Sequence, residues 1–76
     1  ARIRLACRRG MLELDLFLLP FFEAVYSTLT EQEQEIFQSM LQQSDQQLQR
    51  WLLGMEFPPQ ELQELIAKIR YHKKSS

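Results

Sequence analysis

Apolar residues recur at helical spacing along almost the whole chain. The first segment, residues 2–8, is one such stretch. Ile3, Ala6 and Cys7 follow one another at i, i+3 and i+4, which places them on one side of a helix. Gly10 then interrupts the pattern, and because glycine tolerates a positive φ, we expect a sharp turn there.

From Met11 to Leu29 nearly every position is apolar. A helix that is apolar on most sides usually forms the buried centre of a bundle, so we expect this segment to be central. Pro20 lies inside it. Proline removes one backbone hydrogen bond and clashes with the preceding turn, so we expect a kink or a break at this position.

Start and stop signals predict three further helices. Thr30 and Glu33 have the spacing of a capping box, and Ser44 is a second N-cap candidate. Gly54 is expected to end the helix that follows Ser44, as a left-handed residue, and the pair at 58–59 is two prolines suited to the first turn of a last helix. The apolar stripes expected to enter the core are Ile36, Phe37, Met40, Leu41, Leu48, Trp51, Leu52, Leu62, Leu65, Ile66 and Ile69.

The pattern predicts an all-α fold, a compact bundle of about five short helices with tight connections. Two glycines, three prolines and few β-branched residues favour helix over strand. With 76 residues the chain forms one domain, which we expect to span 1–72, and residues 73–76 are expected to be a disordered tail.

Cysteine and histidine usage excludes several kinds of site. Cys7 is the single cysteine, which excludes an internal disulfide framework and a cysteine-rich zinc site, and we interpret it as a small buried hydrophobe. His72, the single histidine, falls at the edge of the expected tail, so no nucleophile–base pair is indicated. We therefore expect no metal site and no enzyme.

The chain shows no membrane or export signal. Its longest apolar run, Leu16 to Phe22, is far shorter than the roughly 20 residues that span a bilayer. No secretory pattern is present, so a cytoplasmic, reducing location is expected.

Charge is distributed unevenly although the net charge is −1. An acidic middle lies between two basic ends, which would form one basic face if the ends folded together. Such a face would allow nucleic-acid binding, which we keep as an alternative, although the overall charge argues against it. The basic residues of the two ends are Arg2, Arg4, Arg8, Arg9, Lys68, Arg70, Lys73 and Lys74.

The segment 8–15, Arg-Arg-Gly-Met-Leu-Glu-Leu-Asp, allows two interpretations. In the structural one, Gly10 makes the turn and Glu13 complements the N-terminus of the following helix. In the functional one, a rigid turn presents arginine and glutamate side by side as a recognition surface. The residues themselves leave both open.

Residues 9–13, Arg-Gly-Met-Leu-Glu, together with the Leu-Pro-Phe-Phe-Glu run at 19–23, resemble the succinate dehydrogenase FAD assembly factors, also called flavinylation factors, whose motif is RGxxE. The resemblance covers nearly the whole chain and looks closer to the bacterial than to the mitochondrial branch. Two departures are Leu5, where family members often carry an aromatic residue, and Asp45-Gln46, where they often carry Asp-Pro.

The resemblance implies a five-helix chaperone that promotes covalent FAD attachment to the flavoprotein subunit of succinate dehydrogenase, with the fumarate reductase flavoprotein as a second candidate client. FAD would be the client's cofactor and not tightly bound by this chain, which is expected to act as a monomer. The alternatives are a direct FAD carrier and a small nucleic-acid-binding regulator. Carried over residue by residue, the motif names Arg9, Gly10 and Glu13 as partner-binding, with Arg8, Met11 and Asp15 added by proximity.

We expect such a chain to bind an immature flavoprotein and shift it towards the conformer competent for FAD attachment. Gly10 would allow close backbone approach and Glu13 would pair with a basic or donor group. Arg9 would hold an acid or backbone carbonyls on the partner, since its forked geometry suits both.

Overall fold

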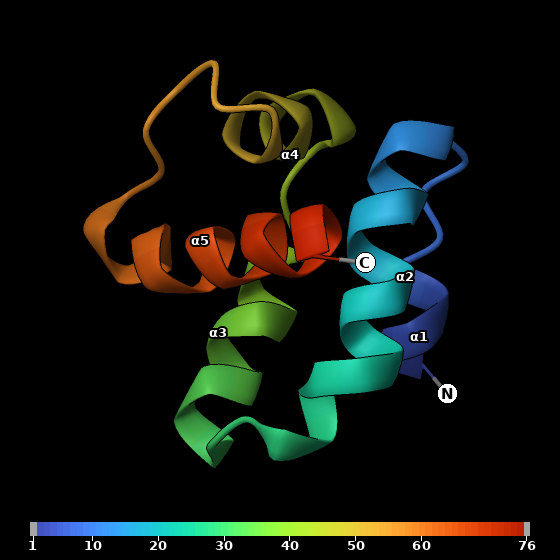
Figure 1. The fold of residues 1–76 in the computed structure, drawn as a ribbon, viewed down its shortest axis with the longest axis vertical. Coiled ribbons are helices and arrows are strands. Elements are labelled where there is room, and N and C mark those ends of the chain that lie inside the picture. The colour runs from blue at the N-terminus through green and yellow to red at the C-terminus, as the bar shows by residue number, and fades with distance from the viewer. Residues whose placement is uncertain (1, 76) are drawn as a thin grey trace.

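Five α-helices and one short 3₁₀-helix follow one another along residues 2–75, the part of the chain that the structure, a computed structural model, describes (Figure 1). No strand occurs in this range, which confirms the predicted all-α fold. The elements are α1 (Arg2–Ala6), α2 (Leu12–Val25), η1 (Tyr26–Thr28), α3 (Glu31–Met40), α4 (Asp45–Leu52) and α5 (Gln60–Ser75).

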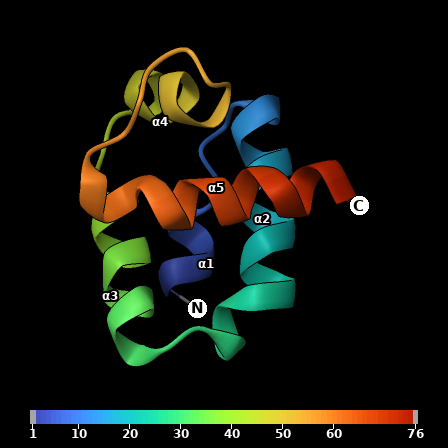
Figure 2. The same ribbon diagram turned by 60° about the vertical axis from the view of Figure 1, so that its left-hand side comes forward.

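The helices form a nearly isometric bundle with extents of 28, 27 and 26 Å. In Figures 1 and 2, α5 passes in front of α2 and α3, α1 lies behind them, and α4 closes one end. The two ends of the chain therefore lie on opposite sides, and the single basic face that we considered does not form. Among residues 2–75, no helix is long and apolar enough to cross a membrane.

Several of the basic side chains are instead used within the bundle. Arg4 binds Glu23 at 2.7 Å and so ties α1 to α2. Lys68 donates to Glu33 at 2.7 Å and ties α5 to α3. This contact and the hydrogen bonds at Thr30 lower the pKa of Glu33 below its usual value.

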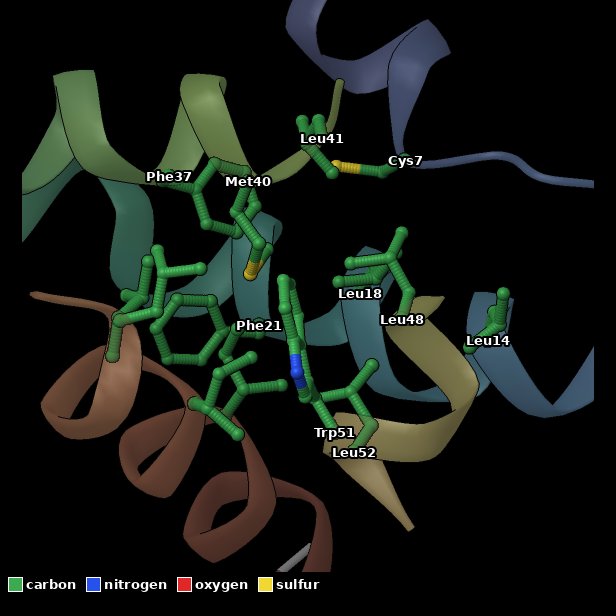
Figure 3. Packing of buried hydrophobic residues seen from close by; sticks show 14 of the residues in the cluster. Cys7, Leu14, Leu18, Phe21, Phe37, Met40, Leu41, Leu48, Trp51 and Leu52 are labelled. Carbon is green, nitrogen blue, oxygen red and sulfur yellow. The ribbon is translucent and has the colours of Figure 1, made fainter. Parts of the chain in front are cut away.

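One hydrophobic core joins α2, α3, α4 and α5, with Cys7 at its edge. Figure 3 shows their side chains facing a common centre, with Phe21, Phe37 and Trp51 near its middle. All the residues expected from the apolar stripes are buried except Ile36, which is half-buried. Burial of Trp51 confirms its interpretation as a core residue.

Helix α2 is buried on one face only, contrary to expectation. Leu14, Leu18 and Phe21 face the core, whereas Leu12 is 74% exposed and Leu16 46% exposed. The reason is size, because a bundle of this length has too few helices to surround one of its own members.

The second departure concerns the course of α2. Of the kink or break expected at Pro20, the break does not occur, because α2 continues through this position. It ends at Val25 rather than Leu29, where the chain tightens into η1 and the Thr28 hydroxyl donates to the Val25 carbonyl at 2.6 Å. Local tightening of this kind is common at helix ends.

The predicted caps are confirmed. Thr30 and Glu33 form the reciprocal capping box, and the Ser44 hydroxyl accepts from the Gln47 N–H at 3.1 Å. Gly54 has φ +76° and follows α4 in a Schellman motif. In that motif the Met55 N–H donates to the Arg50 carbonyl at 2.8 Å and the Gly54 N–H to the Trp51 carbonyl at 3.2 Å.

The C-terminal end differs from expectation. We expected a disordered tail at 73–76, but α5 continues to Ser75, while Ser76 lies outside the described residues. His72 is half-buried, and its ring packs edge-on against that of Phe21 with the two ring centroids 5.9 Å apart. His72, Lys73 and Lys74 occupy the last turn, where positive charge suits the helix dipole. The single-domain bounds, 1–72, remain a prediction.

Candidate functional site

The candidate site is the loop between α1 and α2. Gly10 has φ +81°, so the predicted sharp turn is confirmed and a side chain there would be strained. Nothing lies within 4 Å of the place that a Cβ at Gly10 would occupy. The turn therefore presents bare backbone to open space, where another molecule can approach closely.

Arg9 turns inward from this loop, and its side chain is only 16% exposed. Its Nε donates to Asp45 Oδ1 at 2.8 Å, at the start of α4. Its Nη1 donates to the carbonyls of Leu41 at 2.8 Å and Ala6 at 3.1 Å, and its Nη2 to that of Gln43 at 2.7 Å. These carbonyls include ones left unpaired where α3 ends. Four of the five N–H donors of Arg9 are thus engaged by its own chain, which leaves one Nη2 donor for the partner contact that we expected.

Asp15 supports the same loop from the first turns of α2. Its Oδ1 accepts the Arg9 backbone N–H at 2.7 Å. Its own N–H donates to the Met11 carbonyl at 3.0 Å. Met11 is half-buried against the core as the N-cap residue of α2, which has no side-chain cap. Arg9, Met11 and Asp15 are therefore positioning residues that hold the turn in place.

Glu13 and Arg8 face outward. Glu13 is exposed, and its Oε1 accepts from Gln49 Nε2 at 3.4 Å, a long contact that is easily exchanged. Arg8 is exposed and has no ion pair within residues 2–75. Arg8, Gly10 and Glu13 are therefore all exposed within six consecutive residues of the loop and the first turn of α2.

Sequence reasoning missed the contribution of α4 to the loop and the exposure of Leu12. Asp45 and Gln49 reach the loop from 36 residues away, and no local signal reveals that distance. Leu12, beside the turn, is 74% exposed although the apolar pattern of the segment from Met11 to Leu29 predicts a central helix.

Cys7 lies at the inner side of this loop and is fully buried. Burial raises the pKa of its thiol to about 11, although the positive charges of Arg9 and Arg4 act in the opposite direction. The thiol is therefore protonated at neutral pH, and the interpretation of Cys7 as a buried hydrophobe is confirmed. No three His, Cys, Asp or Glu side chains gather within the described chain as a metal site would require.

Comparison with known proteins adds family similarity to this geometry. Residues 1–73 match the family model described as the flavinator of succinate dehydrogenase. The chain is 52% identical over 54 residues to the FAD assembly factor SdhE of Vibrio cholerae. The aligned region covers 71% of this chain and 63% of that protein. It is 47% identical over 70 residues to the factor of the same name from Coxiella burnetii, covering 91% and 85%. The match thus spans less than two thirds of the Vibrio relative's length.

Proposed function

Because the chain belongs to the family of succinate dehydrogenase flavinators, we propose that it promotes covalent attachment of FAD to the flavoprotein subunit of succinate dehydrogenase. The relatives that match most of this chain are named as FAD assembly factors, not as enzymes. The fumarate reductase flavoprotein is a second candidate client.

The observation that carries the proposal is the exposure of Arg8, Gly10 and Glu13 on a turn that Arg9 and Asp15 hold through hydrogen bonds on its inner side. A recognition surface gains affinity when it is rigid before binding, since less freedom is lost on association. Arg9 and Asp15 provide that rigidity through short hydrogen bonds. The motif arginine thus positions the surface, while Gly10 and Glu13 contact the client.

The chain acts on the client's conformation rather than on the flavin bond. Its one thiol is buried and protonated, so it offers no nucleophile at this surface. It favours the attachment-competent conformer only by the difference between its affinities for the two client states. FAD stays with the client, and the chain works as a monomer in the cytoplasm.

A reconstitution tests this proposal. Purified chain is mixed with apo-flavoprotein and FAD, and covalent flavin is read as fluorescence that survives denaturing gel electrophoresis. The variants are Glu13→Ala and Gly10→Asn, since asparagine tolerates a positive φ and keeps the turn. Glu35→Ala, which removes an exposed carboxylate on α3, is the matched control.

We expect wild type and Glu35→Ala to raise covalent flavin at least tenfold over the sample without the chain. Glu13→Ala and Gly10→Asn should lose most of that gain while remaining folded. Equal yields with and without the chain would refute the proposal. Tight binding of free FAD by the chain alone would replace it with a carrier role.

A further inference from the structure

A second surface lies where the C-terminal turns of α5 pass the side of α2 and the end of α4 (Figure 1). It is an open groove of about 480 Å³. No Asp or Glu lines it. We call it the basic groove and define it by Phe17, Leu53, Arg70, Tyr71, Lys73 and Lys74.

The groove combines positive charge with accessible apolar surface. Tyr71 is 73% exposed and Leu53 38% exposed. The Lys73 ammonium lies 5.7 Å from the centre of the Phe17 ring, within cation–π range. Arg70 and Lys74 have no ion pair within residues 2–75, unlike Arg4 and Lys68. A complementary ligand therefore carries negative charge beside an apolar group.

The groove is continuous with the candidate site along two helices. Phe17 lies one helical turn after Glu13 on α2. Leu53, the residue that caps the C-terminal end of α4, lies one turn after Gln49. Glu13 and Gln49 are hydrogen-bonded to each other, and Phe17 and Leu53 both line the groove, so α2 and α4 border both surfaces. One turn rises about 5.4 Å, so a molecule bound over Glu13 also reaches the groove.

We infer that the basic groove binds an acidic segment of the same flavoprotein, with a carboxylate at Arg70 or Lys74 and an apolar side chain between Leu53 and Tyr71. This inference rests on the proposed function, because the segment belongs to the client. A protein segment fits better than nucleic acid, since the chain's net charge is −1 and apolar side chains form much of the groove.

Binding to apo-flavoprotein tests the inference by charge reversal. Arg70→Glu changes the groove, and Arg2→Glu changes an exposed arginine on α1, on the opposite side of the bundle. We expect Arg70→Glu to raise the Kd at least tenfold and Arg2→Glu to leave it within twofold. Tyr71→Ala, which leaves the charge unchanged, should also weaken binding. Melting temperatures confirm that each variant is folded.

Zero-length carbodiimide crosslinking locates the segment, since it joins lysine amines to carboxylates in contact. We expect the amines of Lys73 or Lys74 to be joined to an Asp or Glu of the client, identified by mass spectrometry. Crosslinks from other lysines only would overturn the inference.

The outcomes separate the two proposals. If wild type does not bind apo-flavoprotein, the proposed function fails and the groove inference fails with it. If Glu13→Ala abolishes binding while Arg70→Glu matches Arg2→Glu, the proposed function stands and the groove inference is wrong. If Arg70→Glu weakens binding of duplex DNA or free FAD but not of apo-flavoprotein, the assigned partner is wrong.

Discussion

At the residue scale, the guanidinium of Arg9 is directed at its own chain. In the sequence, an arginine beside a glycine turn suggests a contact with a partner. In the structure, its guanidinium donates to carbonyls at the end of α3 and to the carboxylate of Asp45, the first residue of α4. The carbonyls at the end of α3 lack donors within the helix, and a planar fork can serve several carbonyls at once. The residue therefore joins its own loop to the stretch between α3 and α4, which lies 32 to 36 positions away in sequence.

Replacement of Arg9 by lysine should destabilise the chain. A lysine ammonium cannot reproduce the forked set of hydrogen bonds, so carbonyls such as those of Leu41 and Gln43 lose their donor. We expect Arg9→Lys to lower the free energy of unfolding by about 1–3 kcal/mol in urea titration. Arg8→Lys, at an exposed neighbour, should stay within about 0.5 kcal/mol of wild type. Equal stability of both variants would contradict the assigned role of Arg9.

Cys7 makes the stability dependent on alkaline pH. Burial raises the pKa of its thiol from 9.0 to about 11, so the folded chain keeps a proton that the unfolded chain releases. The free energy of unfolding falls with rising pH wherever the unfolded state binds fewer protons than the folded state. We therefore expect it to decrease between pH 9 and 11.

The expected loss is about 2 kcal/mol, measured as the difference between wild type and Cys7→Ala across that range. Taking this difference removes the contributions of all other ionisable groups, which are the same in the two proteins. A constant difference between the two proteins from pH 8 to 11 would show that the thiol does not titrate in this way.

At the scale of elements, caps decide where α3 and α4 begin and where α4 ends. Side-chain oxygens of Thr30 and Ser44 accept N–H groups that have no partner within the helix, and Gly54 adopts the conformation that closes α4. Each interaction is local, which is why the sequence pattern predicts it. The ends that were predicted wrongly, the C-terminal ends of α2 and α5, lack such a signal.

Loss of the capping box should weaken α3. Thr30→Ala removes the oxygen that accepts the Glu33 N–H at 3.1 Å, and we expect a cost of about 1 kcal/mol in thermal or urea unfolding. Thr30→Ser keeps the oxygen and should retain nearly all of the stability. If serine and alanine cost the same, the side-chain hydrogen bond is not what stabilises this end.

At the scale of the whole molecule, one small core holds all the helices that carry the two surfaces. Phe37 is fully buried and its ring lies 5.9 Å from that of Phe21, 6.3 Å from that of Phe22 and 5.4 Å from that of Tyr26. A domain of this size has little stability to lose, so a single cavity in the core affects every element.

Phe37→Ala should therefore unfold much of the population. Its expected cost of about 3–5 kcal/mol is comparable with the total stability of a small domain. Circular dichroism and urea titration measure the effect. Phe57→Ala, at a residue that is 91% exposed, is the control and should change the stability by less than about 0.5 kcal/mol. If Phe37→Ala unfolds cooperatively at the same urea concentration as wild type, the description of a single core is wrong.

The sequence by itself determined the helices, their caps, most of the core and the sharp turn at Gly10. These features follow from interactions within about four residues, such as helical periodicity, N-cap hydrogen bonds and the permitted φ of glycine. Only the tertiary structure decided that Arg9 points inward, that Asp45 and Gln49 join the loop, and that Phe17 meets Lys73 in a basic groove. Those contacts join residues about 36 to 56 positions apart, and only the packing of one helix on another brings such residues together.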